Sequence, residues 1–351
     1  MTQPEQTRPA ATTIPRVNIG WLHPFFEILD EAGASWEELL ERAHLPVLAS
    51  DDSSTLVPTS QVYAFAALAA HETRLADLGL RAGSRFDIAP LLPDAESAWT
   101  RPGVYRSIRG FIDVALESST NVDMWIEARS DPEPTTEFFY RGTFGPDHPA
   151  FTTVEQFMVA LMVRWARYGA APTWNPARVN LRATSAPPEA AIRALTHEAR
   201  VHTGQPETSI VFPSQQFTGP VEAFPERYSS VWQRHRRSLR QPNRSEGLAG
   251  SLRLVLRAYL PDGSPDINLA ARLTGTSVRT LQRRLREQGL TYAQLLEELR
   301  HDLAIYLLRD PTRLAAEVSS ELGYRDPAIF TRAFRRWTGT TPSEFRSRFI
   351  V

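Results

Sequence analysis

The chain has 351 residues, which at roughly 150 residues per domain is enough for two domains. Hydrophobic residues make up 42% of it and charged residues 23%, the balance of a soluble protein. The absence of cysteine excludes disulfide bonds, thiolate metal sites and cysteine nucleophiles. The apolar runs are far shorter than the ~20 residues that span a bilayer, and residues 1–13 lack the apolar stretch of a secretory signal. We therefore expect a cytoplasmic protein with no membrane partner.

Charge is distributed unevenly along the chain. The formal net charge is -1, and every basic side chain other than histidine is an arginine. Residues 248–351 hold 16 Arg and 11 Asp or Glu, a net charge of +5, whereas residues 1–247 have a net charge of -6. A basic C-terminal third on an acidic body predicts that this third binds a polyanion.

The N-terminal part mixes two kinds of hydrophobic periodicity. Apolar residues three and four positions apart predict helices, and alternating or β-branched runs between them predict strands. This mixture indicates an α+β domain over residues 14–220, preceded by a disordered extension of residues 1–13. The expected helices are 21–33, 35–43, 60–71, 106–117 and 153–168, and the expected strands are 122–128, 136–144, 178–181 and 209–212.

Residues 221–247 are expected to connect the two domains, because Pro, Gly and Ser interrupt them repeatedly. They contain one basic helical stretch, residues 225–240. A solvated helix is favoured for this stretch over an additional DNA contact.

From residue 248 onward almost every segment has helical periodicity, which predicts an all-α domain over residues 248–351. Asp326 as N-cap and Pro327 at the first helical position fix the start of one of its helices. The expected helices are 252–260, 268–273, 277–288, 291–308, 314–322 and 327–337, with a last turn from residue 342.

A helix-turn-helix pattern occurs twice in this domain. It consists of a small residue, a glycine four residues later and an apolar residue six further on. The small residue lets two helices cross closely, the glycine takes the positive φ of the turn, and the apolar residue fills the crossing. The first copy is Ala271, Gly275 and Leu281, and the second is Ser319, Gly323 and Ile329, where the Ser319 hydroxyl must find a hydrogen-bond partner.

The second helix of each copy, residues 277–288 and 327–337, has an apolar stripe on one face and polar or basic side chains on the other. The side chains of arginine and glutamine match the edges of guanine and adenine in the major groove. Basic outer faces in both copies favour DNA contact over simple solvation. The side chains expected to contact DNA are Arg279, Thr280, Gln282, Arg283, Arg286, Ala328, Thr331, Arg332 and Arg335.

The Leu-rich segment 291–308 joins the two copies. As a helix of about 1.5 Å per residue it would be ~27 Å long. That length is near the ~34 Å of one DNA turn. One chain is therefore expected to reach two successive major grooves, bending the DNA if the two copies are held rigidly.

Two segments resemble the AraC/XylS-type transcriptional regulators. GYRDPAIFTRAFRRWTG (323–339), continuing through residue 346, resembles the C-terminal signature of this family, and SVRTLQRRL (277–285) resembles its first recognition helix. Residues 14–220 are similar to the arabinose-binding-type N-terminal domain of the ornithine-regulator subgroup, through LVP (56–58), LGLR (78–81) and SIVFP (209–213). The resemblance implies that the N-terminal domain senses a small molecule or mediates dimerisation.

The chain departs from the family pattern in three places. Leu314 stands where a serine N-cap is usual, and Ser319 where alanine is usual, which predicts a less firmly held first helix in the second copy. Residues 87–105 differ from the usual Gly-Leu-Leu-Gly-Tyr pattern, so the ligand of a relative is not transferred to this chain.

Catalytic and metal-binding motifs are weak or missing. His197 and His202 are five residues apart, whereas a zinc-binding H-E-x-x-H needs a spacing of four, so two partly exposed histidines on a helix are the favoured interpretation. No nucleophile elbow, dinucleotide fingerprint or P-loop is found. Several aromatic residues either line a ligand cavity or, as is more common, belong to the core, with Arg101, Arg106 and Arg109 nearby as partners for a carboxylate. These aromatic residues are Trp99, Tyr105, Phe138, Phe139, Trp165 and Trp174.

The sequence therefore predicts a sequence-specific DNA-binding regulator with no catalytic residues, cofactor or metal. The expected partners are double-stranded DNA, a small-molecule effector, a second copy of the chain, and RNA polymerase if the protein is an activator. Two other classes stay open: an enzyme with a helical C-terminal cap, and an adaptor whose basic helices bind an acidic protein. An enzyme would show turnover with no DNA binding by residues 248–351, and an adaptor would leave no discrete protected DNA site.

Overall fold

The chain divides into two compact units. The first spans Pro15–Leu45 and Asp52–Gln241, and the second combines Met1–Ile14, Pro46–Asp51 and Pro242–Val351. The predicted helix 225–240 and nearly all of the predicted extension lie outside the described residues. The computed structural model describes residues 13–48, 55–86, 104–120, 122–129, 133–169, 173–217 and 247–349.

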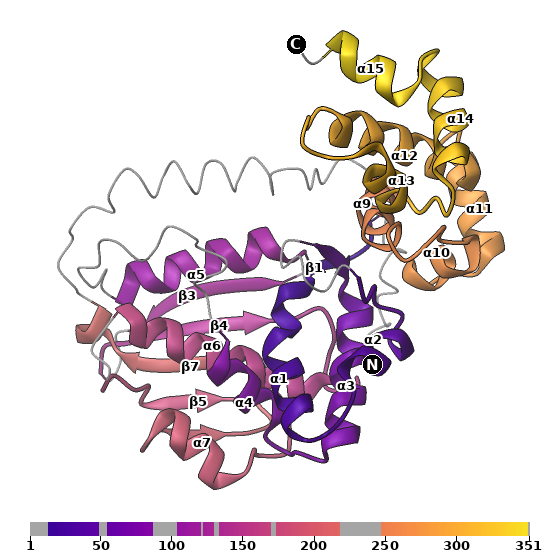
Figure 1. The fold of residues 1–351 in the computed structure, drawn as a ribbon. Helices are drawn as coiled ribbons and strands as arrows, with labels where there is room; N and C mark the ends of the chain where they lie inside the picture. Colours follow the sequence, from indigo (N-terminus) through magenta and orange to yellow (C-terminus); the bar gives the residue numbers. More distant parts are fainter. Residues whose placement is uncertain are drawn as a thin grey trace. The chain divides into compact units, whose positions relative to one another are not determined.

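The first unit is built on a five-stranded sheet (Figure 1). All neighbouring strands run antiparallel except the parallel pair β5–β6. A second, two-stranded sheet pairs β1 (Arg16–Asn18) with β2 (Leu56–Pro58). The order across the large sheet is β3 (Asp123–Arg129), β4 (Thr135–Arg141), β7 (Thr208–Pro213), β5 (Arg178–Asn180) and β6 (Arg200–His202).

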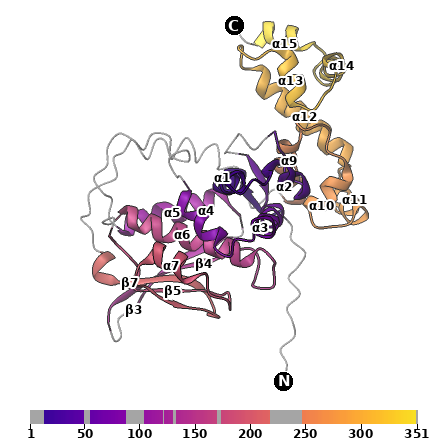
Figure 2. The same cartoon turned by 60° about the horizontal axis from the view of Figure 1, so that its bottom comes forward.

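Helices α5 and α6 cover one face of the large sheet, as both ribbon views show (Figures 1 and 2). Helix α4 packs closely on α6 because two of its residues are glycines: a Cβ at Gly79 would lie 2.0 Å from the carbonyl oxygen of Thr153. The helical segments are η1 (Ile19–Leu22), α1 (His23–Glu31), α2 (Trp36–Arg42), α3 (Thr59–Thr73), α4 (Leu78–Arg85), α5 (Val104–Ser118), α6 (Phe151–Gly169), α7 (Glu189–Thr196) and η4 (Ser214–Phe217).

The second unit is helical throughout its C-terminal part. The long helix α12 buries a leucine stripe along one side, and α9, α13 and α14 all pack on it. The helices are α9 (Gly247–Tyr259), α10 (Ile267–Leu273), α11 (Val278–Glu287), α12 (Tyr292–Leu308), α13 (Ala315–Glu321), α14 (Pro327–Thr338) and α15 (Pro342–Phe349).

The predicted fold class, an α+β part followed by an all-α part, is confirmed. Each helix and strand expected within the described residues is present, with bounds that shift by a few residues. Ser35 caps α2: its hydroxyl accepts a hydrogen bond from the N–H of Glu38 at 3.1 Å. The short strands β1, β2 and β6 and the helices α4 and α7 were not predicted.

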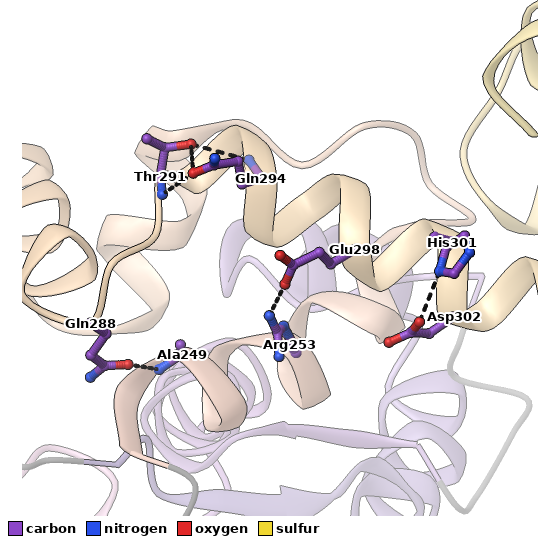
Figure 3. A network of polar contacts seen from close by, with 8 residues as sticks. All are labelled: Ala249, Arg253, Gln288, Thr291, Gln294, Glu298, His301 and Asp302. Atoms are coloured by element: carbon purple, nitrogen blue, oxygen red, sulfur yellow. Dashed lines mark hydrogen bonds and ion pairs between the residues drawn. The ribbon is translucent and has the colours of Figure 1, made fainter. Parts of the chain in front are cut away.

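Polar contacts fix α12 to its neighbours (Figure 3). Glu298 in the middle of α12 forms an ion pair with Arg253 of α9. At the start of α12, Thr291 and Gln294 cap the helix reciprocally: each side chain accepts a hydrogen bond from the other residue's backbone N–H, at 3.2 and 2.9 Å. This helix is therefore fixed both at its first turn and along its length.

The Ser319 hydroxyl does not find the partner that was predicted for it. Ser319 is completely buried on α13, and within the described residues its Oγ makes no hydrogen bond. Helix α13 also begins without a side-chain cap, because Leu314 has no acceptor, although Glu317 accepts a hydrogen bond from the Leu314 N–H at 2.8 Å. Both departures from the family pattern therefore withdraw stabilising interactions from this helix.

Ser319→Ala is expected to raise the free energy of unfolding by about 1 kcal/mol, because it removes a buried hydroxyl without a partner. Ser251→Ala is the matched control: that buried hydroxyl accepts from the Ile14 N–H at 3.2 Å and donates to the Leu248 carbonyl at 3.0 Å. It is expected to lower the free energy of unfolding by about 1 kcal/mol. Urea denaturation measures both, and a less stable Ser319→Ala variant would contradict the assignment.

Candidate nucleic-acid interface

The first helix-turn-helix consists of α10, a turn and α11. Asp266 caps α10 by accepting a hydrogen bond from the Leu269 N–H at 2.7 Å, and this bond holds the pKa of Asp266 below its ordinary value. Gly275 in the turn has φ 62°, and the Ser277 hydroxyl caps α11 by accepting from the Thr280 N–H at 3.2 Å. Leu281, on the inner face of α11, is fully buried, as the spacing predicts.

The outer face of α11 presents the predicted basic side chains to solvent. Arg279, Gln282, Arg283 and Arg286 are all exposed. Arg283 pairs with Glu287 one turn later at 2.8 Å, an exposed pair of the kind that contributes little to stability. Thr280 is half-buried and its hydroxyl is hydrogen-bonded to that of Ser277 at 3.0 Å, so it is less available to a ligand than the arginines.

The second helix-turn-helix consists of α13, a turn and α14. Asp326 caps α14 by accepting from the Ala328 N–H at 2.8 Å, and Pro327 occupies the first helical position, both as predicted. Ala328, Arg332 and Arg335 are exposed on its outer face. Thr331 is half-buried, and its hydroxyl donates to the Pro327 carbonyl at 2.9 Å.

The prediction that Ile329 fills the helix crossing is wrong. Ile329 is 45% exposed, and Phe330, the fourth residue of α14, is buried instead. Leu281 is likewise the fourth residue of α11. The turn after Gly323 is one residue longer than the turn after Gly275, so the buried position moves one residue along the chain. Ile329 is therefore the third residue of its helix, as Thr280 is of α11, and it lies at the edge of the outer face. A spacing counted from the turn glycine does not predict this placement.

Polar side chains of α12 hold α14, the second recognition helix, in addition to the apolar packing between the two helices. The carboxylate of Glu297 accepts hydrogen bonds from Trp337 Nε1 at 2.7 Å and from the Arg336 guanidinium, and these bonds lower the pKa of Glu297. Arg300 donates to the carbonyl of Leu322 at 3.1 Å, and its guanidinium lies 4.9 Å from the ring centre of Tyr324. The turn and the far end of α14 are thus both fixed to α12.

Helix α11, the first recognition helix, is fixed at its C-terminal end by a hydrogen bond to α9. The Gln288 side chain, directly after α11, accepts from the Ala249 N–H of α9 at 3.3 Å (Figure 3). The Tyr292 hydroxyl of α12 donates to the Pro265 carbonyl, just before α10, at 2.7 Å. In both ribbon views α11 and α14 lie on the same side of α12 (Figures 1 and 2). The exposed guanidinium groups are therefore carried by two helices with common support.

Other candidate sites have less support. The expectation that His197 and His202 share a helix is wrong: His197 ends α7 with φ 53°, and His202 lies on strand β6. No group of three or more metal-ligating side chains occurs among the described residues. Among the residues that the structure describes, no helix is long and apolar enough to cross a membrane.

Of the predicted cavity aromatics, Trp99 and the Tyr105 side chain lie outside the described residues, as do Arg101 and the Arg106 side chain. The other four, Phe138, Phe139, Trp165 and Trp174, are buried in the core and do not line the cavity described below.

Comparison with known proteins places this architecture in a family. A family model described as the arabinose-binding domain of AraC transcription regulators, N-terminal, matches residues 33–221, more than half of the chain. A helix-turn-helix domain model matches residues 270–348. The chain therefore belongs to the AraC family of transcription regulators.

Individual relatives match over shorter stretches. The ornithine utilization regulator of Pseudomonas aeruginosa is 42% identical over 101 residues, which cover 29% of this chain and 30% of the relative. The transcriptional regulator VqsM of the same species is 38% identical over 103 residues, 28% of this chain and 32% of the relative. The chain thus matches about a third of the length of these relatives. The solved structure of CdpR from P. aeruginosa covers 94% of this chain and 98% of its own, at 19% identity and a TM-score of 0.39.

The two turn glycines are expected to differ in their tolerance of alanine. At Gly275 a Cβ would meet nothing within 4 Å, so Gly275→Ala is expected to cost only the ~1–2 kcal/mol of a left-handed residue. At Gly323, with φ 77°, a Cβ would lie 2.6 Å from the Leu260 carbonyl oxygen and 2.8 Å from that of Gly263. Gly323→Ala is expected to cost more, because backbone must also move. Urea denaturation compares the two, and equal losses would contradict the close approach at Gly323.

Proposed function

We propose that this chain is a sequence-specific DNA-binding transcription regulator that reads two adjacent major-groove segments through α11 and α14. The observation that carries the proposal is that both helices, fixed to common supports, present exposed guanidinium groups on their outer faces. Membership of the AraC family supports it. On this basis the chain acts on the chromosome in the bacterial cytoplasm and is not an enzyme.

The helix positions assign roles to the side chains. Counted from the first residue of each helix, Arg283 corresponds to Arg332 and Arg286 to Arg335. Arginines at these positions match guanine, and Gln282 matches adenine. The exposed Ile329 suits the methyl group of a thymine, the apolar feature of the major groove. Arg279, Thr280, Ala328 and Thr331 complete the two faces.

The N-terminal part is proposed to bind a small-molecule effector and to contact a second copy of the chain. Support comes from the family model, whose description names ligand binding for residues 33–221. RNA polymerase is a further partner if the protein activates transcription. An acidic protein partner in place of DNA is the alternative that footprinting distinguishes, because it would leave no protected site of about two helical turns.

Arg283→Ala is expected to weaken specific DNA binding by about 1–3 kcal/mol and to relax the base preference at one position. Arg193→Ala is the matched control, because Arg193 on α7 is exposed as Arg283 is, and it pairs with Glu189 one turn away at 2.7 Å, as Arg283 pairs with Glu287. Selection of bound sequences from a random DNA pool, followed by affinity measurement at fixed salt, reads out both effects. A uniform loss across all sequences would show that Arg283 contacts only phosphate, and unchanged binding would overturn the proposal.

Arg332→Ala is expected to relax base preference at a different position, about one helical turn (~10 base pairs) from the position affected by Arg283→Ala. The reason is that the two arginines occupy equivalent positions on separate recognition helices. The same selection experiment on both variants measures the spacing. If both variants change the same base pair, α11 and α14 do not read separate segments.

A further inference from the structure

The first unit contains a cavity of about 70 Å³ close to its two-stranded sheet. Its walls come from segments far apart in the chain, including strand β1, helices α1, α3 and α5, the end of β4, and α6. All of these segments belong to the same compact unit. The cavity thus lies inside the part that the family model matches.

The chemistry of the wall is almost entirely apolar. Phe25, Ala66, Phe157 and Met158 are among the side chains that face it, and none of the residues that line it carries a formal charge. The Tyr63 and Tyr140 hydroxyls, which also belong to the wall, are hydrogen-bonded to each other. Burial raises the pKa of both tyrosines, so these hydroxyls stay neutral.

Two lining residues carry polar atoms that have no partner. The Trp21 indole Nε1 and the Thr59 Oγ1 are buried and make no hydrogen bond within the described part of the chain. An unpaired buried donor is costly, and such groups in folded proteins commonly mark an absent water or ligand. Both atoms are covered by the surrounding side chains, so a bound molecule reaches them only if these side chains shift.

A buried carboxylate, Glu155, lies near the two wall tyrosines, but its oxygens are already hydrogen-bonded. Glu155 on α6 accepts hydrogen bonds from the N–H groups of Arg182 and Ala183, at 2.7 and 3.1 Å, and from the Thr208 hydroxyl. It does not belong to the cavity wall. A cationic ligand would therefore find no free carboxylate in the wall, and an anionic ligand would find no arginine there.

We propose that this cavity is the effector site and that it takes the apolar end of an uncharged molecule, such as a short alkyl chain. The inference rests on the effector-binding role proposed above. The volume is about half that of the ~150 Å³ apolar cavity that binds benzene, so only a slender group fits. Arabinose, with many hydroxyls, and ornithine, with its charges, would each leave polar groups unpaired against this wall.

Ligand-observed NMR on the full chain tests the proposal with 1-hexanol and hexanoate, which share an alkyl chain and differ in charge, and with arabinose and ornithine. We expect 1-hexanol to bind at least ~10-fold more tightly than hexanoate, because the charge would be buried unpaired, and we expect no binding of arabinose or ornithine. Tighter binding of hexanoate, arabinose or ornithine would overturn the proposal. DNA binding, measured on the same preparation, tests the proposed regulatory function separately.

Ala66→Leu, which fills the cavity from α3, is expected to weaken 1-hexanol binding at least ~10-fold. Ala190→Leu, the same change on the exposed side of α7, is expected to leave it unchanged. Ala115→Leu fills the cavity from α5 and serves as a second test if circular dichroism shows Ala66→Leu to be unfolded. Unchanged binding in a folded cavity variant would overturn the assignment, and if neither variant folds, the comparison of 1-hexanol with hexanoate decides.

Discussion

The buried leucine face of α12 is the constraint on which the DNA-binding part depends. Leu295, Leu299 and Leu303 are each at most 9% exposed, and they remove a continuous apolar stripe from water. This burial holds α12 against α9, α13 and α14. On its polar side, Glu297 bonds to Trp337 of α14 and Glu298 to Arg253 of α9. Burial of the leucine stripe stabilises the packed helices, whereas the two carboxylates determine how α9 and α14 are oriented on α12. The exposed arginines of α14 are thus carried by a helix fixed to α12, and those of α11 by a helix whose end is joined to α9 through Gln288.

Much of the fold could be predicted from the sequence, because long helices and alternating strands carry strong periodic signals. Strands β1 and β2, with three residues each, are too short for such a signal, and they form only because they pair with each other. The recognition faces were predicted from the same periodicity, but Ile329 was misplaced. Its position depends on the length of the turn after Gly323, which a spacing counted from the glycine does not register.

The cavity illustrates a different limit of sequence-based prediction. Its wall residues are individually ordinary core residues, and only the folded chain brings Phe25, Ala66 and Met158 together. The described aromatics that were weighed as cavity residues belong to the core, the favoured interpretation, and pack on other rings, as Trp165 does on Phe111 with ring centres 4.6 Å apart.

The course of the chain brings the cavity wall close in sequence to the DNA-binding unit. Val17 of β1 lines the cavity, and Ile14, three residues earlier, belongs to the other unit, where its N–H donates to Ser251 of α9 at 3.2 Å. On the partner strand, Thr59 directly follows β2 and also lines the cavity. Only Pro15 therefore separates a strand whose Val17 lines the cavity from Ile14, which is bonded to a helix that packs on α12.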